Sequence, residues 1–361
     1  MGNLFDYLEW RGDLRFSEVA LGEVDSLILS IVSYLDFDGI VPSAEEGGSV
    51  TYLEAMRSYL KINKGRPSLG KFFPPETVAL AVRAAKTRRY AGIRLSHYTC
   101  DTAPEEQKQF AALTFRITKD KYFVAFRGTD DTLVGWKENF NMSFMLPVPA
   151  QIAAVGYFER VTGDISNGEF YLGGHSKGGN LAVYAAVKSS ESLKNRIITV
   201  FSNDGPGFDR EFIEGEDYER VKDRLRTIVP QSSVVGMLLE HEENYEVIKS
   251  AATGLMQHQG HTWEVMGGSF LHLDTVTEDS RLIDEKLKAW LDAMTPDERE
   301  RFVDTVFETL SATNAKTLTE LTAEKVKLVK AWNSLEPDTR SVILKCIAIL
   351  VKHNAITIVK R

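Results

Sequence analysis

The sequence is poor in the features that mark secreted and membrane-bound proteins. It has two cysteines, Cys100 and Cys346, without the dense spacing of a disulfide framework, so both are expected to be reduced. The amino terminus carries Asp6 and Glu9 and lacks a basic segment followed by an apolar one, which predicts no secretory signal. The longest apolar runs, such as residues 342–351, fall well short of the roughly 20 residues of a spanning helix. These absences predict a cytoplasmic chain with no transmembrane segment.

Positive charge and ligand-binding motifs are also scarce. Lys and Arg number 43 against 51 Asp and Glu, which gives a net charge of -8 at pH 7. Phosphate-rich partners need clustered Lys and Arg, so we expect no nucleic acid partner. Residues 65–71 have the spacing of a phosphate loop, but Phe72 replaces the Ser or Thr that binds Mg²⁺. His258 and His261 have no second ligand pair beside them. We therefore expect no cofactor and no metal.

Hydrophobic periodicity divides the chain into three parts. Apolar residues recur at helical spacing through the N-terminal segment. Strand-like segments follow between residues 93 and 126, and strands then alternate with helices at the length of βα units. The last part is helical, with a capping box at Thr295. The sequence predicts an α/β domain with a mainly parallel sheet over residues 1–276, including the N-terminal helices, and a helical C-terminal region over residues 277–361.

The best-defined motif is a glycine-rich turn around Ser176. Residues 173–179 read Gly-Gly-His-Ser-Lys-Gly-Gly and stand between an apolar strand and an apolar helix. A catalytic serine must protrude from a tight strand-turn-helix bend, which requires small residues two positions before and two positions after it. Gly174 and Gly178 meet this requirement. The motif predicts Ser176 as the nucleophile of a serine hydrolase, with a structural glycine turn as the alternative.

A serine nucleophile needs a general base, usually a histidine that a carboxylate orients. In α/β hydrolases the chain order is serine, acid, histidine. His258 follows a strand-like segment in a loop that contains glycine, so it is the first candidate, and His261 is its main competitor. Of the remaining downstream histidines, His241 is interpreted as a solvated loop residue and His272 as a packing or solvent-facing residue, and His353 lies in the helical tail.

The candidate acid is Asp204. It ends the strand at residues 197–203 and is expected at the carboxyl edge of the sheet, where the sites of α/β proteins form. Two alternatives remain. Asp204 could begin an ordinary Asp-Gly turn and bond its own backbone, or Asp209 could be the acid.

The oxyanion hole requires two preorganised N–H donors. One normally comes from the residue after the nucleophile, here Lys177, and the other from another strand end. An apolar strand ends at Gly128, and Thr129 offers a backbone N–H and a hydroxyl there. Arg127 and Asp130 are interpreted as residues that fix this loop.

These motifs together resemble the class 3 lipases, whose pattern is an F-R-G-[ST] strand end, a nearby Trp and a G-H-S-x-G-G elbow. The corresponding positions are residues 126–129, Trp136 and residues 174–179. The chain is more closely similar to a bacterial lipase-class-3-like family of uncharacterised α/β hydrolases, which shares further stretches over roughly residues 3–270: residues 7–14, residues 204–208, and residues 257–258 followed by Trp263. The resemblance implies an α/β-hydrolase core, a Ser/His/acid triad that uses His258, and an oxyanion hole formed by Thr129 and Lys177.

The sequence departs from the class 3 lipase pattern at two positions. The acid of those lipases usually follows the next strand in a D-x-V-P segment, whereas residues 227–235 contain no aspartate. Asp204 is expected to replace it, because pancreatic-type lipases place their acid one strand earlier in a similar turn. Lys177 stands where the lipases generally have an apolar residue, and it is expected to favour an anionic substrate or to reach solvent.

The prediction from these residues is a carboxylic ester hydrolase that acts on a small-molecule or lipid ester. A catalytically inactive hydrolase-fold binding or scaffold protein is the alternative, because the usual acid is missing and a helical tail is present. A peptidase or an acyltransferase would use the same elbow. The sequence identifies neither the acyl group nor a protein partner of the C-terminal helices.

Overall fold

The computed structural model describes residues 2–63, 74–239, 245–311 and 313–323, with positions 333, 337 and 340. Several positions considered above lie outside the described residues: Cys346, His241, His353, and residues 65–71 and 342–351. None of the helices within the described ranges has the length and apolar character needed to cross a membrane.

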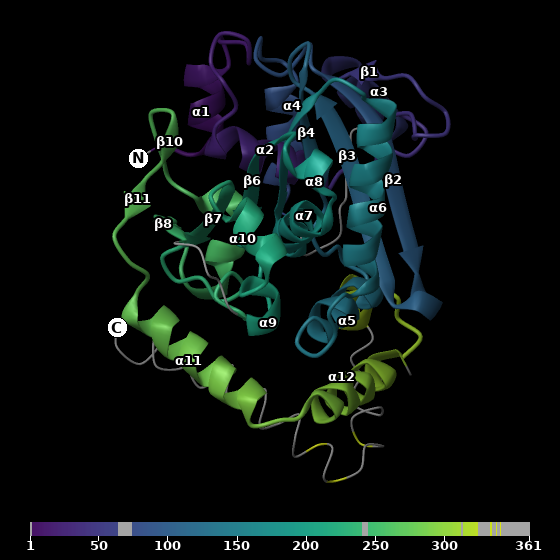
Figure 1. Cartoon of the computed structure of the whole chain (residues 1–361), viewed down its shortest axis with the longest axis vertical. Helices are drawn as coiled ribbons and strands as arrows, with labels where there is room; N and C mark the ends of the chain where they lie inside the picture. The colour runs from purple at the N-terminus through teal and green to yellow at the C-terminus, as the bar shows by residue number, and fades with distance from the viewer. Residues whose placement is uncertain are drawn as a thin grey trace.

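The centre of the molecule is a large sheet with helices on both faces (Figure 1). Its strand order within the described residues is β1-β2-β3-β4-β5-β6-β7-β8-β11. The strands are β1 (Val50–Thr51), β2 (Arg94–Ala103), β3 (Lys108–Arg116), β4 (Lys121–Phe126), β5 (Glu169–His175), β6 (Ile197–Asn203), β7 (Leu225–Pro230), β8 (Glu246–Ile248) and β11 (His272–Leu273). Strands β4 to β8 are parallel and the outer pairings are antiparallel. The fold is therefore of the α/β-hydrolase type that the sequence predicts, with antiparallel strands added at the edges.

The N-terminal helices cover one face of the sheet, as the helical periodicity of this segment predicts. They are α1 (Leu4–Arg11), α2 (Glu23–Val32), α3 (Tyr52–Ile62) and α4 (Glu76–Ala84). Helix α2 is buried along its whole length and packs against the sheet. Asp25 of α2 forms a fully buried ion pair with Arg89 at 2.6 Å, so both charges are compensated inside this layer.

The opposite face carries the helices that alternate with the parallel strands. They are α6 (Pro149–Asp164), α7 (Lys177–Lys188), α8 (Glu191–Lys194), α9 (Arg210–Ile213) and α10 (Glu216–Lys222). Small residues at Ala182, Ala185 and Ala186 are fully buried, which lets α7 pack closely on the layers beside it. Because α7 begins where β5 ends, its first turn lies at the carboxyl edge of the sheet.

The described part of the C-terminal region is mainly helical, with α11 (Glu278–Asp292), α12 (Pro296–Ser311) and α13 (Leu318–Ala323). The predicted capping box is present, since Thr295 and Glu298 exchange backbone-to-side-chain hydrogen bonds. In Figure 1, α11 and α12 run below the sheet, and α12 lies next to α5 (Leu133–Asn141), a helix that the sequence did not predict. Phe140 and Phe307 bring these two helices together, with ring centroids 5.8 Å apart.

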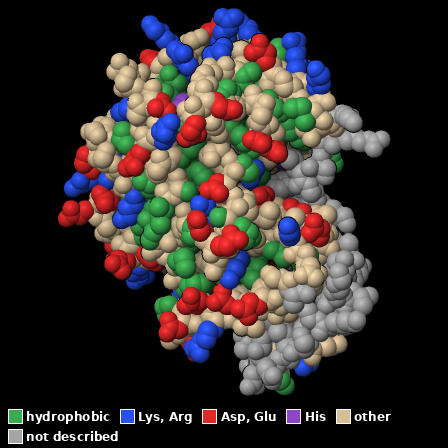
Figure 2. Space-filling model, turned by 90° about the vertical axis from the view of Figure 1, so that its right-hand side faces the viewer, with side chains coloured by type: hydrophobic (Ala, Val, Ile, Leu, Met, Phe, Trp, Pro, Cys, Tyr) green, Lys and Arg blue, Asp and Glu red, His purple; other side chains and the backbone are tan. Residues whose placement is uncertain are grey.

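Three short 3-10 helices and one hairpin complete the described elements. The helices are η1 (Pro104–Glu106), η2 (Gly254–His258) and η3 (Gly260–Thr262), and the hairpin pairs β9 (Val265–Met266) with β10 (Ser269–Phe270). Acidic and basic side chains are interspersed over the face shown in Figure 2. This mixed surface agrees with the charge balance of the sequence.

Candidate active site

The turn around Ser176 is a strained bend between β5 and α7. Ser176 has φ 59° and ψ -135°, a conformation that costs a non-glycine residue on the order of 1–3 kcal/mol. A Cβ atom on Gly174 would lie 2.2 Å from the carbonyl carbon of Gly178, and one on Gly178 would lie 2.1 Å from the carbonyl oxygen of Phe126. Only glycine fits at these two positions. The local geometry is that of the tight strand-turn-helix elbow that the glycine pattern predicts.

Asp204 and His258 meet at this edge of the sheet. The Nδ1 atom of His258 lies 2.6 Å from Oδ2 of Asp204, whose side chain is fully buried. The other carboxylate oxygen, Oδ1, accepts hydrogen bonds from the Ser233 hydroxyl at 2.5 Å and from the Gly236 N–H at 3.1 Å. An ionised carboxylate accepts only, so Nδ1 of His258 carries the donated proton and its Nε2 is left as the basic atom.

This geometry separates Asp204 from its alternatives. Asp204 bonds residues 29 to 54 positions away in the chain and not its own turn, so the Asp-Gly-turn interpretation is wrong. Asp209 instead caps α9, where its carboxylate accepts the Phe212 N–H at 2.8 Å. His261 lies in η3, and its ring nitrogens have no hydrogen-bond partner among the described residues. Of the two competing histidines, His258 is the one hydrogen-bonded to the carboxylate.

The serine and the histidine belong to neighbouring loops. The ring of His175, the residue before Ser176, stacks at a tilt on the His258 ring with centroids 4.6 Å apart. Trp263 is fully buried and donates its indole N–H to the Gln257 carbonyl at 2.8 Å, which packs and fixes the loop beside His258. The predicted packing role of Trp263 is confirmed.

The loop after β4 approaches the elbow from the other side. A Cβ atom on Gly128 would lie 3.2 Å from Cβ of Ser176. The hydroxyl of Thr129 is buried and has no hydrogen-bond partner within the described part of the chain. Arg127 contacts Asp130 at 3.4 Å, and Asp130 accepts the Thr132 N–H at 2.9 Å, so the loop is braced as expected. The loop that approaches the elbow at Gly128 thus carries, at the next residue, a buried hydroxyl without a partner in the described ranges.

The expectation for the side chain of Lys177 is wrong. It is fully buried and does not reach solvent. Its ammonium group donates to the Gln109 carbonyl at 2.7 Å, to Oε1 of Gln109 at 2.8 Å and to Oε2 of Glu138 at 2.8 Å. Burial lowers the pKa of Lys177. Because Glu138 belongs to α5, this ion pair ties the first turn of α7 to the helix that follows the Thr129 loop.

A possible metal site lies elsewhere, at Glu23, Glu246 and His272, whose ligand atoms lie within 4.8 Å of one another. Arg226 contacts Glu23 at 2.9 Å and Glu246 at 2.5 Å, and His272 contacts Glu23 at 2.8 Å. The guanidinium already supplies the positive charge that these carboxylates need. The cluster is therefore better described as an ion-pair network than as a metal site.

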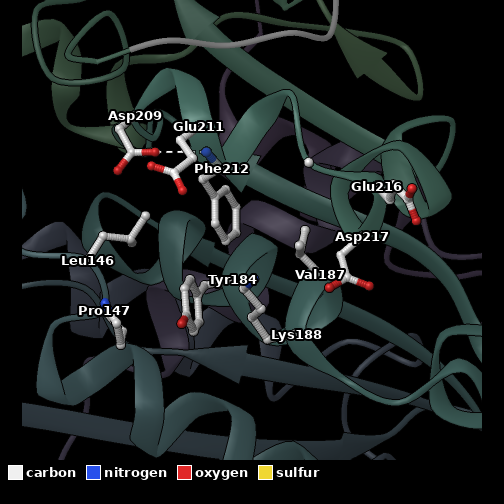
Figure 3. A pocket seen from close by; sticks show the side chains of 11 residues that line it. Leu146, Pro147, Tyr184, Val187, Lys188, Asp209, Glu211, Phe212, Glu216 and Asp217 are labelled. Carbon is white, nitrogen blue, oxygen red and sulfur yellow. Dashed lines mark hydrogen bonds between the residues drawn. The ribbon is translucent and has the colours of Figure 1, made fainter.

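Figure 3 shows a pocket of about 410 Å³ along the C-terminal half of α7. The aromatic rings of Tyr184 and Phe212 line it, and acidic side chains stand on two sides, with Asp209 and Glu211 on one and Glu216 and Asp217 on the other. None of the five predicted site residues lines this pocket. It is separate from the elbow.

Comparison with known proteins places this arrangement in a family. A sequence model of the Mbeg1-like family matches residues 84–308, which is more than half of the chain and includes β4, the elbow and the His258 loop. The chain belongs to the Mbeg1-like family. The expected resemblance to a lipase-class-3-like family is thereby confirmed in part, and the bacterial origin stays a prediction. No curated protein matches this Mbeg1-like chain.

Two solved structures show how far the likeness of this Mbeg1-like chain extends. The Rhizomucor miehei lipase propeptide complex is 16% identical with a TM-score of 0.33, over 43% of this chain and 57% of the lipase chain. A mutant form of MDLA from Penicillium cyclopium is 14% identical with a TM-score of 0.35, over 68% of this chain and 83% of that chain. The chain thus spans little more than half of the first of these proteins.

Several residues of the site carried no separate signal in the sequence. Glu138 lies 39 positions before Lys177, and Ser233 lies 29 positions after Asp204, so only the folded chain brings each pair together. Tyr34 contacts His175 from 141 positions away. The signal that the sequence offered was Lys177 itself, because the class 3 lipases generally have an apolar residue at this position. A lysine buried there needs a partner of opposite charge.

Proposed function

We propose that the chain is a serine hydrolase that cleaves a carboxylic ester, with Ser176 as nucleophile, His258 as general base and Asp204 as the acid that orients it. The observation that carries the proposal is the hydrogen bond of 2.6 Å between His258 and the buried Asp204 carboxylate, at the sheet edge where Ser176 occupies a strained elbow. Such a pair supplies the oriented base that a serine hydroxyl requires.

The proposed reaction runs through an acyl-enzyme. Nε2 of His258 accepts the Ser176 hydroxyl proton as Oγ attacks the ester carbonyl carbon. The N–H groups of Thr129 and Lys177 and the unpaired Thr129 hydroxyl hold the oxyanion. The leaving alcohol takes the proton from His258 as the tetrahedral intermediate collapses. Water then attacks the acyl-enzyme with His258 again as base, which releases the acid and restores Ser176.

The proposed substrate is a small-molecule or lipid ester. Leu255 and Met256 lie three and two positions before His258 in η2 and expose 56% and 54% of their surface. Apolar side chains beside the base suit an uncharged acyl or alkyl group, since contact with it removes apolar surface from water. The buried Lys177–Glu138 pair offers no free cation to an anionic substrate. The cytoplasmic location and the division into domains at residues 276 and 277 remain predictions.

The proposal is tested by hydrolysis of p-nitrophenyl esters of increasing chain length, with Ser176→Ala, His258→Ala and Asp204→Asn. We expect kcat to fall by at least about 10³-fold in each variant. His261→Ala and Asp209→Asn are matched controls, because they remove the competing histidine and aspartate, and they are expected to retain near-normal turnover. A folded wild-type protein that hydrolyses no ester would favour the inactive binding protein instead.

A further inference from the structure

A chain of two hydrogen bonds reaches from the N-terminal helical layer into the proposed active site. The hydroxyl of Tyr34, just after α2, lies 3.2 Å from Nδ1 of His175. Nε2 of His175 lies 2.7 Å from the backbone carbonyl oxygen of His258. Tyr34 and His175 are both buried. The residue before the nucleophile is therefore bonded directly to the loop that carries the proposed base.

The carbonyl oxygen of His258 determines which group donates in each of these two hydrogen bonds. A carbonyl oxygen only accepts, so Nε2 of His175 must carry a proton. Burial and the nearby His258 lower the pKa of His175 to about 3, so the ring is neutral and its Nδ1 has a free lone pair. Burial raises the pKa of Tyr34, which keeps its hydroxyl protonated. Tyr34 thus donates to His175, and His175 donates to His258.

The same hydroxyl also lies against the loop that carries Thr129. A Cβ atom on Gly128 would stand only 2.1 Å from the Tyr34 hydroxyl and 2.4 Å from the His175 carbonyl oxygen. That carbonyl lies 3.4 Å from the hydroxyl as well. One polar atom from the N-terminal layer is therefore packed at the junction of the Gly128 loop and the elbow.

We propose that Tyr34 and His175 are positioning residues that align the His258 loop, the elbow and the Thr129 loop for the reaction proposed above, on which this inference rests. The His258 ring is held at Nδ1 by Asp204, and its backbone is held at the carbonyl by His175. Neither Tyr34 nor His175 accepts the substrate proton. Their effect is on the distance and angle between the base and Ser176, where a displacement of about 1 Å can cost 10²-fold in rate.

Tyr34→Phe tests the inference because it removes a single oxygen atom and keeps the buried ring. We expect kcat to fall about tenfold or more while KM stays within about twofold, since the substrate surface is unchanged. Tyr52→Phe is the matched control. The Tyr52 hydroxyl is buried in the same helical layer and donates to the Ala81 carbonyl at 2.8 Å, remote from the elbow. It should lower the melting temperature by a similar amount and leave kcat unchanged.

The role of His175 is tested by a pair of substitutions. His175→Gln keeps an N–H that can reach the His258 carbonyl and is expected to recover most of the kcat that His175→Leu loses. A purely structural role would not produce this rescue in kcat at constant KM. Equal kcat values in Tyr34→Phe and Tyr52→Phe, or in His175→Gln and His175→Leu, would overturn the inference.

Nitrogen NMR of the histidine rings decides the inference independently of turnover. We expect His175 as the neutral Nε2–H tautomer and a shift of the His258 ring signals in Tyr34→Phe but not in Tyr52→Phe. Wild-type protein without ester hydrolysis would refute the proposed function, and the NMR comparison would still support or overturn the alignment of His258 by Tyr34. Unchanged His258 signals in an active enzyme would refute the inference alone.

Discussion

The ammonium group of Lys177 lies 2.8 Å from the carboxylate of Glu138, and both side chains are fully buried. Glu138 also accepts the Gln109 N–H at 3.1 Å and the Ala150 N–H at 2.8 Å, so both of its carboxylate oxygens have hydrogen-bond donors. The residue whose N–H we assign to the oxyanion hole is thereby anchored through its side chain to β3 and α5.

Breaking this pair should be costly. Lys177→Met leaves the Glu138 carboxylate buried without its cation, and we expect the free energy of unfolding to fall by about 3–5 kcal/mol in urea titrations. Adding Glu138→Gln removes the uncompensated charge and should recover part of the loss. As a control, Arg83→Ala breaks an exposed ion pair with Glu9 and should change stability little. A Lys177→Met protein as stable as wild type would contradict this account of the elbow.

Thr129→Val tests the unpaired hydroxyl. Because this hydroxyl has no hydrogen-bond partner within the described residues, its removal should leave stability unchanged or slightly raised. If it stabilises the oxyanion, kcat for ester hydrolysis should fall by about 10²–10³-fold. Thr129→Ser keeps the hydroxyl and should retain most of the activity, so equal rates for the two variants would exclude the hydroxyl from the oxyanion hole.

The backbone strain at Ser176 predicts that glycine is more stabilising than alanine at this position. At an ordinary position alanine stabilises a chain relative to glycine, because glycine loses more conformational freedom on folding. At φ 59° and ψ -135° glycine fits without strain. We expect Ser176→Gly to be more stable than Ser176→Ala by about 1 kcal/mol in thermal or urea unfolding. The opposite order would mean that the elbow relaxes when the serine is removed.

One buried and one half-buried histidine, His175 and His261, make stability depend on pH. Burial lowers the pKa of His175 from 6.5 to about 3 and that of His261 from 6.5 to about 4. Between these values and pH 6.5 the unfolded chain binds more protons than the folded one, so stability is full above about pH 6.5 and is lost as the pH falls toward 4. Each histidine contributes at most about 1.4 kcal/mol per pH unit.

The measurement for this prediction is the free energy of unfolding between pH 4 and 7, for wild type and for His261→Asn. The asparagine of the variant does not bind a proton when the chain unfolds, whereas His261 does. The stability of the variant should therefore decline less steeply below pH 6.5. Parallel curves for the two proteins would show that His261 titrates normally in the folded state.

The local features of the sequence were sufficient for the elbow and for most of the sheet. The glycine pattern around Ser176, the apolar strands and the Thr295 capping box all depend on neighbours in the chain, and the structure confirms them. Helix α5 was not predicted, and its packing partners come from β3 and from α12, which are distant from it in the sequence.

The contacts between distant residues could not be inferred in the same way. Lys177 looked like a solvent or substrate contact because nothing nearby in the chain compensates its charge, and Glu138 meets it only across the fold. Asp204 could be nominated from its place at a strand end. Excluding a simple Asp-Gly turn needed the position of His258, which is 54 residues away.

The central claim is that Ser176 is a nucleophile activated by His258. The most direct test is intact-mass and peptide analysis of the purified protein after incubation with a fluorophosphonate probe, alongside Ser176→Ala and His258→Ala. The account predicts one adduct per wild-type chain, located on Ser176, none on Ser176→Ala, and a labelling rate reduced by at least about 10³-fold in His258→Ala. An adduct at another residue, or a folded wild-type protein that takes up no probe, would contradict it.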